Sequence, residues 1–397
     1  MTETAANSGR APGRAGPVSG MIVVSSALVL GALPLFMVGG LAVQIKDEFG
    51  FSEAALGAAV TIGFVLGAIS APFGGRLADL VGPRTTLYLG SSMSVIALAG
   101  LGLLTSGWGV MVVFLCLAGL ALAITDPGLA ILVSRAMPAG RQGLAFGIKE
   151  ASIPAAALAA GLAVPAVALT VGWRWAFAIG LAPWAVIVFL LPRIDTDRRA
   201  PAIEDTDTAR APATPPHRRA LALAAAAAAL GTAAASGVGI FLTNSAVAMG
   251  LSPGNAGLLL ATGSVAGMVA RVGTGVMADR SGGPQFKLIA IMLAVGSITM
   301  ALGGSGNTAL LILGTIGAFT GGWAWTGIFF LSLVKTSPHR PGAVAGIGTA
   351  GLGVGNAAGP LLFGVVAQTF SFGAAWLAAA IISGVAALVM ATARRRF

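Results

Sequence analysis

The chain has 397 residues, of which 56% are hydrophobic and only 9% are charged, and its formal net charge is +10. Soluble domains carry about a quarter charged residues, so this composition excludes a soluble protein and predicts one whose solvent is the lipid bilayer. The apolar runs are about twenty residues long, as transmembrane helices need, and not the shorter alternating strands of a barrel. We therefore predict an all-α membrane protein. In such a protein the positions of the basic residues indicate the orientation of the helices in the membrane, and we expect no binding to nucleic acid.

The chain begins with a polar stretch, residues 1–18, which predicts a flexible cytoplasmic tail. It is not a cleaved signal, because the apolar run that follows is too long and many more runs come after it. Twelve transmembrane helices are predicted at residues 20–44, 54–74, 86–105, 109–134, 143–169, 174–192, 219–248, 256–277, 287–304, 308–334, 342–368 and 373–392.

The longest connection lies at residues 193–218 and is charged and rich in proline. Such a composition is typical of a flexible linker. It divides the chain into an N-terminal six-helix half, residues 19–192, and a C-terminal six-helix half, residues 219–397.

Basic residues predict the orientation of the helices. Fourteen of them lie in one set of connections, whereas the opposite set holds only Lys46 and Arg174. By the positive-inside rule the first set is cytoplasmic. We therefore expect both termini in the cytoplasm and a multi-pass protein of a bacterial cytoplasmic (inner) membrane.

The two halves repeat each other. Residues 51–82 align with residues 251–282 without gaps at an offset of 200, and the matches include Gly57 with Gly257 and Gly67 with Gly267. Six helices is an even number, so the halves have the same orientation in the membrane. Parallel repeats of this kind place a binding site between the halves, near the bilayer midplane.

The stretch "GGRLADLVGPR", residues 74–84, resembles the signature loop of the major facilitator superfamily, Gly-x-x-x-Asp-Arg-x-Gly-Arg-Arg. Leu80 replaces the usual basic residue. A degenerate copy, "GVMADRSGG", stands at residues 275–283. The residues that match are Gly75, Asp79, Gly82 and Arg84 in the first loop and Gly275, Asp279, Arg280 and Gly282 in the second.

This resemblance covers the whole chain and implies transport by alternating access, with the two loops as a conformational gate. Asp79 can accept hydrogen bonds from the N-terminal end of a neighbouring helix or from a cytoplasmic arginine. The alternative is a charge cluster that only sets topology.

Three charged residues lie inside the fourth and fifth predicted spans. Lys149 and Glu150 belong to the fifth span, and by the helical rise Lys149 lies about 10 Å inside the membrane. Asp126 in the fourth span lies about 13 Å deep by the same arithmetic. A charge at the lipid-facing centre costs about 2.5–3.5 kcal/mol, so we expect all three to face a cavity or each other. We expect Lys149 to point toward the cavity, with Asp126 or Glu150 as its counter-charge. The alternative is an inert ion pair that fixes the packing of the two helices.

Further cavity candidates come from the C-terminal half. Trp323 and Trp325 lie deep in the tenth span, where packing or lipid-facing roles compete with a cavity wall. Asn244 and Asn356 are candidates too, although an interhelical hydrogen bond is the commoner use of such an asparagine. Arg271 in the eighth span has Ala71 as its repeat partner, and either a structural pair or a substrate contact would explain it.

The sequence holds no nucleophile–base set, metal cluster or phosphate loop, so we predict no enzyme and no cofactor. The leading hypothesis is proton-coupled uptake of a small organic anion by a monomer, because protonation of one acid would leave Lys149 freer to bind a carboxylate. The segment "GIKEASIP" also resembles the branch that includes cyanate and nitroimidazole carriers, from which Glu150 departs. The alternatives are a drug or metabolite exporter driven by proton antiport and a non-transporting membrane sensor.

Overall fold

The computed structural model describes residues 17–136, 139–194, 215–337 and 341–397. These residues form helices and short connections, without a strand among them. Most of the predicted tail, residues 1–18, and of the predicted linker, residues 193–218, lies outside the described residues.

The N-terminal half contains five helical stretches that are long enough to cross a membrane. Its helices are α1 (Pro17–Gly40), α2 (Ala42–Phe49), α3 (Glu53–Leu103), α4 (Trp108–Ala136), η1 (Ala139–Arg141), α5 (Gln142–Ala163), η2 (Val164–Ala168), α6 (Trp173–Ala176), η3 (Phe177–Gly180), α7 (Leu181–Leu190) and η4 (Leu191–Arg193).

The C-terminal half follows the same order of spans. Its helices are α8 (Pro215–Ala248), α9 (Pro253–Arg280), α10 (Phe286–Gly303), α11 (Thr308–Gly317), η6 (Ala318–Gly322), α12 (Thr326–Thr336), α13 (Pro341–Thr369) and α14 (Phe372–Arg394).

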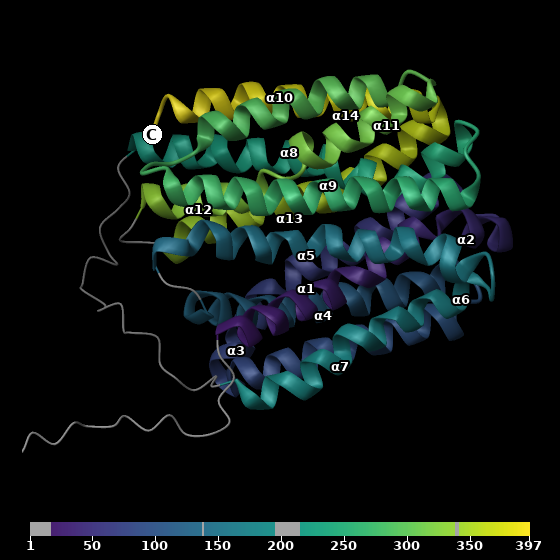
Figure 1. The fold of residues 1–397 in the computed structure, drawn as a ribbon, viewed down its shortest axis with the longest axis horizontal. Coiled ribbons are helices and arrows are strands. Elements are labelled where there is room, and N and C mark those ends of the chain that lie inside the picture. The colour runs from purple at the N-terminus through teal and green to yellow at the C-terminus, as the bar shows by residue number, and fades with distance from the viewer. Residues whose placement is uncertain (1–16, 137–138, 195–214, 338–340) are drawn as a thin grey trace, which may run out of the picture.

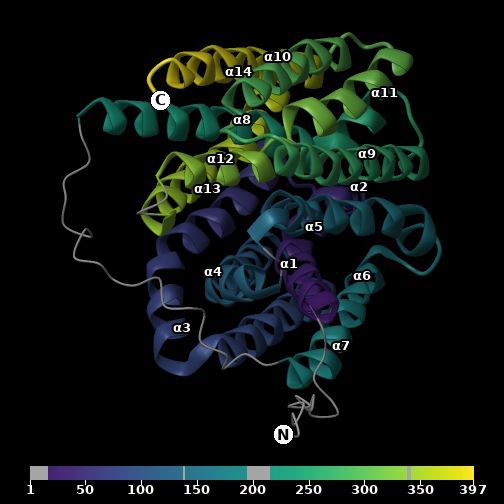
Figure 2. The same ribbon diagram turned by 60° about the vertical axis from the view of Figure 1, so that its left-hand side comes forward.

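Helix α3 accounts for two of the predicted spans. It has 51 residues, and Gly82 interrupts it with φ 81° and ψ 161°. A positive φ is readily adopted only by glycine, so this residue lets the chain bend between two arms, which diverge in Figure 2. The eleven apolar helices long enough to cross a membrane, counted over the described residues, thus correspond to the twelve spans expected.

The tenth span differs from its prediction as one continuous helix. Helix α11 passes into a π-helical turn, η6, and residues 323–325 lie outside any helix before α12 begins at Thr326. The indole Nε1 of Trp325 donates to the carbonyl of Gly322 at 2.8 Å. This bond holds the turn and removes that carbonyl from the helical ladder. The repeat counterpart α4 runs unbroken through its described backbone.

The two halves lie against each other along antiparallel pairs of helices, in which Gly143 of α5 meets Gly275 of α9 and Gly161 meets Gly257. Figure 1 shows the C-terminal half above the N-terminal half, with α5 and α9 side by side at the boundary. The innermost span of each half is α1 or α8, whose apolar windows are 78% and 67% buried. The outer helices expose large apolar residues, such as Phe73 and Leu388, where lipid would surround them.

One pair of helices between the halves, α3 and α13, packs closely at only one end. We call the end with the connection from Lys46 to Ser52 the Lys46 face, and the end with the connections after Gly82 and Arg280 the basic-loop face. At the Lys46 face α3 meets α13 so closely that a Cβ on Gly57 would lie 2.4 Å from the carbonyl oxygen of Pro360. Nearer the basic-loop face, a Cβ on Gly75 would meet no described atom within 4 Å. The contact between these two helices is therefore concentrated at the Lys46 face.

Candidate functional site

A cavity of about 70 Å³ lies between the two halves. Its walls are mostly apolar side chains of α1, α3, α4, α5 and α13. The polar groups that reach it are Glu150, Thr232, Thr326 and Asn356, and the indole of Trp323 forms part of the wall. A pocket of this type, apolar with a few convergent polar groups, is the usual form of a small-molecule site.

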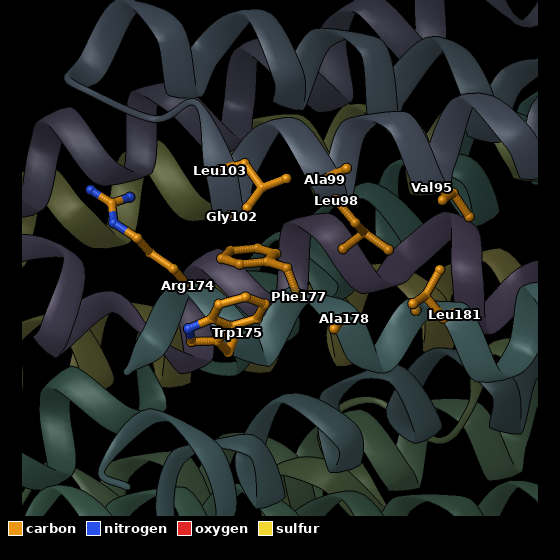
Figure 3. Close-up of a pocket in the computed structure, with 11 residues that line it drawn as sticks. Val95, Leu98, Ala99, Gly102, Leu103, Arg174, Trp175, Phe177, Ala178 and Leu181 are labelled. Carbon is orange, nitrogen blue, oxygen red and sulfur yellow. The ribbon is translucent and has the colours of Figure 1, made fainter. Parts of the chain in front are cut away.

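A second hollow lies between α3 and the helices η3 and α7, on the outside of the N-terminal half, and measures about 170 Å³. Figure 3 shows that its labelled side chains are apolar apart from the indole nitrogen of Trp175 and Arg174, whose guanidinium points away from the rings of Trp175 and Phe177. That guanidinium instead pairs with Glu48 at 2.5 Å. The hollow thus lacks the several convergent polar groups of the smaller cavity, to which we assign the candidate site.

Helices α4 and α5 bring the three predicted charges together. Lys149 Nζ lies 3.5 Å from Asp126 Oδ1 and 3.6 Å from Glu150 Oε1. Both distances exceed the 2.7–2.9 Å that is usual for a charge-assisted hydrogen bond, so the lysine is shared loosely between two acids. The side chain of Asp126 is 44% exposed and that of Glu150 only 4% exposed. Glu150 is the acid that faces the cavity.

A fourth charge, Arg271 on α9, belongs to the same region. It is buried, and its guanidinium donates to the backbone carbonyl of Glu150 at 2.6 Å and to that of Trp323 at 3.0 Å. Its Cζ also lies 5.2 Å from the centroid of the Trp323 ring. Arg271 thus joins the two halves beside the cavity. From the sequence, its role was open between a structural pair and a substrate contact.

The four formal charges sum to zero. Asp126 and Glu150 contribute two negative charges, and Lys149 and Arg271 contribute two positive charges. Arg271 therefore changes the expectation from the sequence, in which the first three groups carry a net charge of −1. A proton added to either acid would leave the cluster with one positive charge in excess.

The remaining predicted cavity residues separate into two groups. Trp323 and Asn356 line the cavity, as expected. Trp325 is fully buried outside it, packed edge-on against Phe329 at 5.6 Å between ring centroids. Asn244 also lies elsewhere, near the Lys46 face, where its Nδ2 donates to Glu53 Oε2 at 2.9 Å.

Two hydroxyl groups in the cavity were not singled out from the sequence. Thr232 on α8 and Thr326 at the start of α12 are 1% and 2% exposed, and neither hydroxyl has a hydrogen-bond partner among the described residues. Many threonines and serines in these spans bond the carbonyl four residues earlier, as Thr125 bonds Ala121 at 2.8 Å. Four other buried hydroxyls also lack a partner among the described residues, those of Ser91, Thr105, Ser245 and Thr315, but none of these residues lines the cavity. Only the cavity distinguishes these two hydroxyls from the others, so sequence alone gave no signal.

The two signature loops at the basic-loop face differ in their contacts. Asp279 accepts hydrogen bonds from the backbone N–H groups of Gly143 and Leu144, at 2.6 and 2.9 Å, at the start of α5. A carboxylate at a helix N-terminus satisfies free N–H groups and the helix dipole together. This is the kind of contact that the sequence predicted for Asp79, which instead is exposed.

The other residues of the two loops differ in what they contact. Gly275 approaches α5 so closely that a Cβ there would lie 2.4 Å from the carbonyl oxygen of Gly143. Arg84 acts within the N-terminal half, where it donates to the carbonyl of Ile194 at 2.8 Å. Arg280 is exposed, and a Cβ on Gly282 would meet no described atom within 4 Å.

The Lys46 face has its own polar tie, which the sequence analysis missed. Glu53 pairs with Lys46 and accepts a hydrogen bond from Asn244 of the other half. Next to it, the N–H of Ala54 donates to Gln368 Oε1 at 3.0 Å, again across the halves. We call Lys46, Glu53, Asn244 and Gln368 the Lys46-face latch.

Replacement of Glu53 by alanine is expected to open the Lys46 face. Loss of one charged hydrogen bond costs about 1–2 kcal/mol, which changes the population of an open state about five- to thirtyfold. Ala32, which lines the cavity, is replaced by cysteine in a variant that also carries Cys116→Ser. The measurement is the rate at which an impermeant maleimide, added on the side of the Lys46 face, alkylates this cysteine. Glu48→Ala is the matched control, because Glu48 pairs with Arg174 inside one half. Equal rates in the two variants would contradict the role of the latch.

Comparisons with known proteins agree with this architecture. The sequence profile of the Major Facilitator Superfamily matches residues 22–312, well over half of the chain. An uncharacterized MFS-type transporter of Mycobacterium tuberculosis is 31% identical over 117 residues, which are 30% of this chain and 20% of that protein. The match thus spans about a fifth of that relative's length.

Solved structures share the fold over nearly the whole chain. A bacterial homologue of the human lysosomal transporter Spinster, in an inward-facing and occupied conformation, has a TM-score of 0.73 at 15% identity, and 98% of each chain is covered. The inward-facing and unoccupied conformation gives the same score at 14% identity. The cyanate and nitroimidazole branch is not distinguished by these relatives and stays a prediction. The profile match and the twelve-span fold together show that the chain belongs to the Major Facilitator Superfamily and is a multi-pass membrane protein.

Proposed function

We propose that this protein transports a small monovalent organic anion together with a proton. The observation that carries the proposal is the charge cluster of Asp126, Lys149, Glu150 and Arg271, which has no net formal charge and includes the cavity residue Glu150. With one acid protonated, the cluster carries one positive charge that a bound anion can neutralise. Lys149 supplies the mobile part of that charge, because its two ion pairs are long.

Proton and anion then assist each other's binding. A charge in a low-dielectric cavity is costly unless it is compensated, so the protonated site favours an anion and the occupied site favours a proton. By linkage each ligand changes the affinity for the other by the same factor. The site stays near neutrality when it holds both the proton and the anion, or neither of them. Symport requires that the halves change orientation only in these two states.

The cavity walls point to a substrate with an apolar body. Phe36, Phe64 and Leu352 are among the side chains that surround the few polar groups. The same walls favour the second candidate, export of a lipophilic drug or metabolite by proton antiport, for which Glu150 alone could alternate between proton and substrate. The sensor alternative has no support from the fold, since the superfamily is one of transporters.

Symport is expected to show itself in proteoliposomes that contain the purified protein. An inward proton gradient should drive faster accumulation of a radiolabelled monocarboxylate than in protein-free liposomes, which acetate, butanoate and benzoate also enter as neutral acids, and should acidify the lumen faster. The transport should be insensitive to an imposed membrane potential, because one proton and one monovalent anion carry no net charge. Proton efflux coupled to uptake of a lipophilic cation, without carboxylate transport, would instead establish the antiport candidate.

We also propose that the basic-loop face is the cytoplasmic one, in a bacterial inner membrane, and that the monomer is the transporting unit. The support is the distribution of arginine and lysine between the two faces. Under this orientation the latch closes the outer face, and inward movement of protons drives uptake.

A further inference from the structure

The break in the tenth span places a helix N-terminus at the cavity. Helix α12 has 11 residues and begins at Thr326, which lines the cavity, directly after the non-helical residues 323–325. The N-terminal end of a helix presents N–H groups and a partial positive charge, which together favour an anion. Half-helices that begin inside the membrane use this end to bind anionic groups of transported solutes in unrelated transporters.

The second observation that indicates a ligand here is a pair of buried hydroxyl groups. Thr326 and Thr232 come from different helices, both line the cavity, and neither hydroxyl has a partner among the described residues. Thr326 does not bond the carbonyl four residues earlier, that of Gly322, which instead accepts from Trp325 Nε1. An unpaired buried hydroxyl is destabilising, and a bound acceptor would satisfy it.

A fixed positive charge stands behind the same backbone. Arg271 donates to the carbonyl of Trp323, inside the break, and its Nε has no hydrogen-bond partner among the described residues. The guanidinium is held by two carbonyls and so keeps its place. Neither Arg271 nor Lys149 is among the residues that line the cavity, but Lys149 is shared between two acids, whereas Arg271 is bonded to the backbone of the break itself.

We propose that the carboxylate of the substrate binds at the start of α12, where the hydroxyls of Thr326 and Thr232 donate to it and Arg271 supplies the fixed charge. The ligand is a monocarboxylate with an apolar body that lies against the remaining walls. This inference rests on the proposed anion transport and adds its binding residues: Lys149 acts on the charge of Glu150, and the C-terminal half holds the anion.

Equilibrium binding to the purified full-length protein tests this assignment. The probes are acetate, butanoate and benzoate, each paired with its neutral amide, and dissociation constants come from the ligand-dependent rise in the unfolding midpoint. The wild type should prefer each carboxylate that it binds over the matching amide. Thr326→Val and Thr232→Val keep the side-chain shape and should each weaken carboxylate binding about tenfold, with little change for the amide. Thr326→Ser should restore the preference.

Thr262→Val is the control, because Thr262 is exposed on α9 and its hydroxyl bonds Leu258. If the wild type prefers carboxylates and both valine variants keep that preference, the anion binds elsewhere and this assignment is wrong, while anion transport stands. Equal weakening for carboxylate and amide would reduce the threonines to packing and also overturn it. If no carboxylate binds the wild type, the proposed function fails, and this inference fails with it.

Discussion

Lys149→Ala is expected to reduce proton-driven carboxylate uptake on the order of 100-fold, while the protein remains folded in the membrane. The substitution leaves Asp126 and Glu150 without the cation that lies 3.5 and 3.6 Å from them, and removal of one partner from a buried charge pair costs several kcal/mol. The cluster then holds an excess negative charge, which opposes an anion in the cavity. Uptake into proteoliposomes, normalised to reconstituted protein, is the measurement.

Two further variants make the Lys149 result specific. Lys287→Ala removes an exposed lysine at the basic-loop face and should transport as the wild type does. Lys149→Arg keeps the charge but replaces a point charge by a planar fork of donors, so it should bind the acids more rigidly and slow turnover more than binding. Wild-type uptake by Lys149→Ala would show that the cluster is a packing device and has no part in transport.

Glu150→Gln is expected to abolish accumulation driven by a pH gradient while exchange of substrate across the membrane continues. The amide fixes the neutral form of the one cluster acid that lines the cavity. The site should then bind anions without waiting for a proton. Exchange and gradient-driven uptake are measured on the same proteoliposomes, so that loss of coupling is separated from loss of transport.

Asp126→Asn is the matched comparison, because Asp126 lies at nearly the same distance from Lys149 but is 44% exposed. It should retain accumulation, since its charge is screened by water and it does not line the cavity. The opposite pattern would move the proton from Glu150 to Asp126. Accumulation at the wild-type level in both amide variants would exclude proton coupling through this cluster.

The depth of a residue in the membrane was predictable from its position along a helix, whereas the direction of its side chain was not. The rise of 1.5 Å per residue placed Asp126 and Lys149 at similar depths, and the structure brings them within 3.5 Å. The same arithmetic could have placed Asn244 near the Lys46 face, because α8 ends four residues later at Ala248. Trp325 shows the limit of such reasoning: it has the depth of a cavity residue, but its ring turns into the C-terminal half.

The hardest features to predict were the break in a helix and the contacts between a long side chain and distant backbone groups. The tenth span is apolar throughout, so hydropathy indicated one helix, and the break depends on the indole of Trp325 reaching one carbonyl. The partners of Arg271 are backbone carbonyls, which leave no signature in a sequence. Repeat comparison did flag Arg271, since its counterpart is Ala71, but it could not name what the guanidinium binds.

The partners of Arg271 also bear on how the chain enters the membrane. Helix α9 is made before the backbone of Trp323 exists and after that of Glu150, so the emerging span must hold its guanidinium with half of its final acceptors missing. An arginine at the centre of an isolated span costs about 2.5–3.5 kcal/mol on insertion. A C-terminal half produced by itself would keep part of that cost permanently, because Glu150 belongs to the other half. The first six spans therefore supply α9 with an acceptor that the C-terminal half lacks by itself, so the two halves are not equivalent in the membrane.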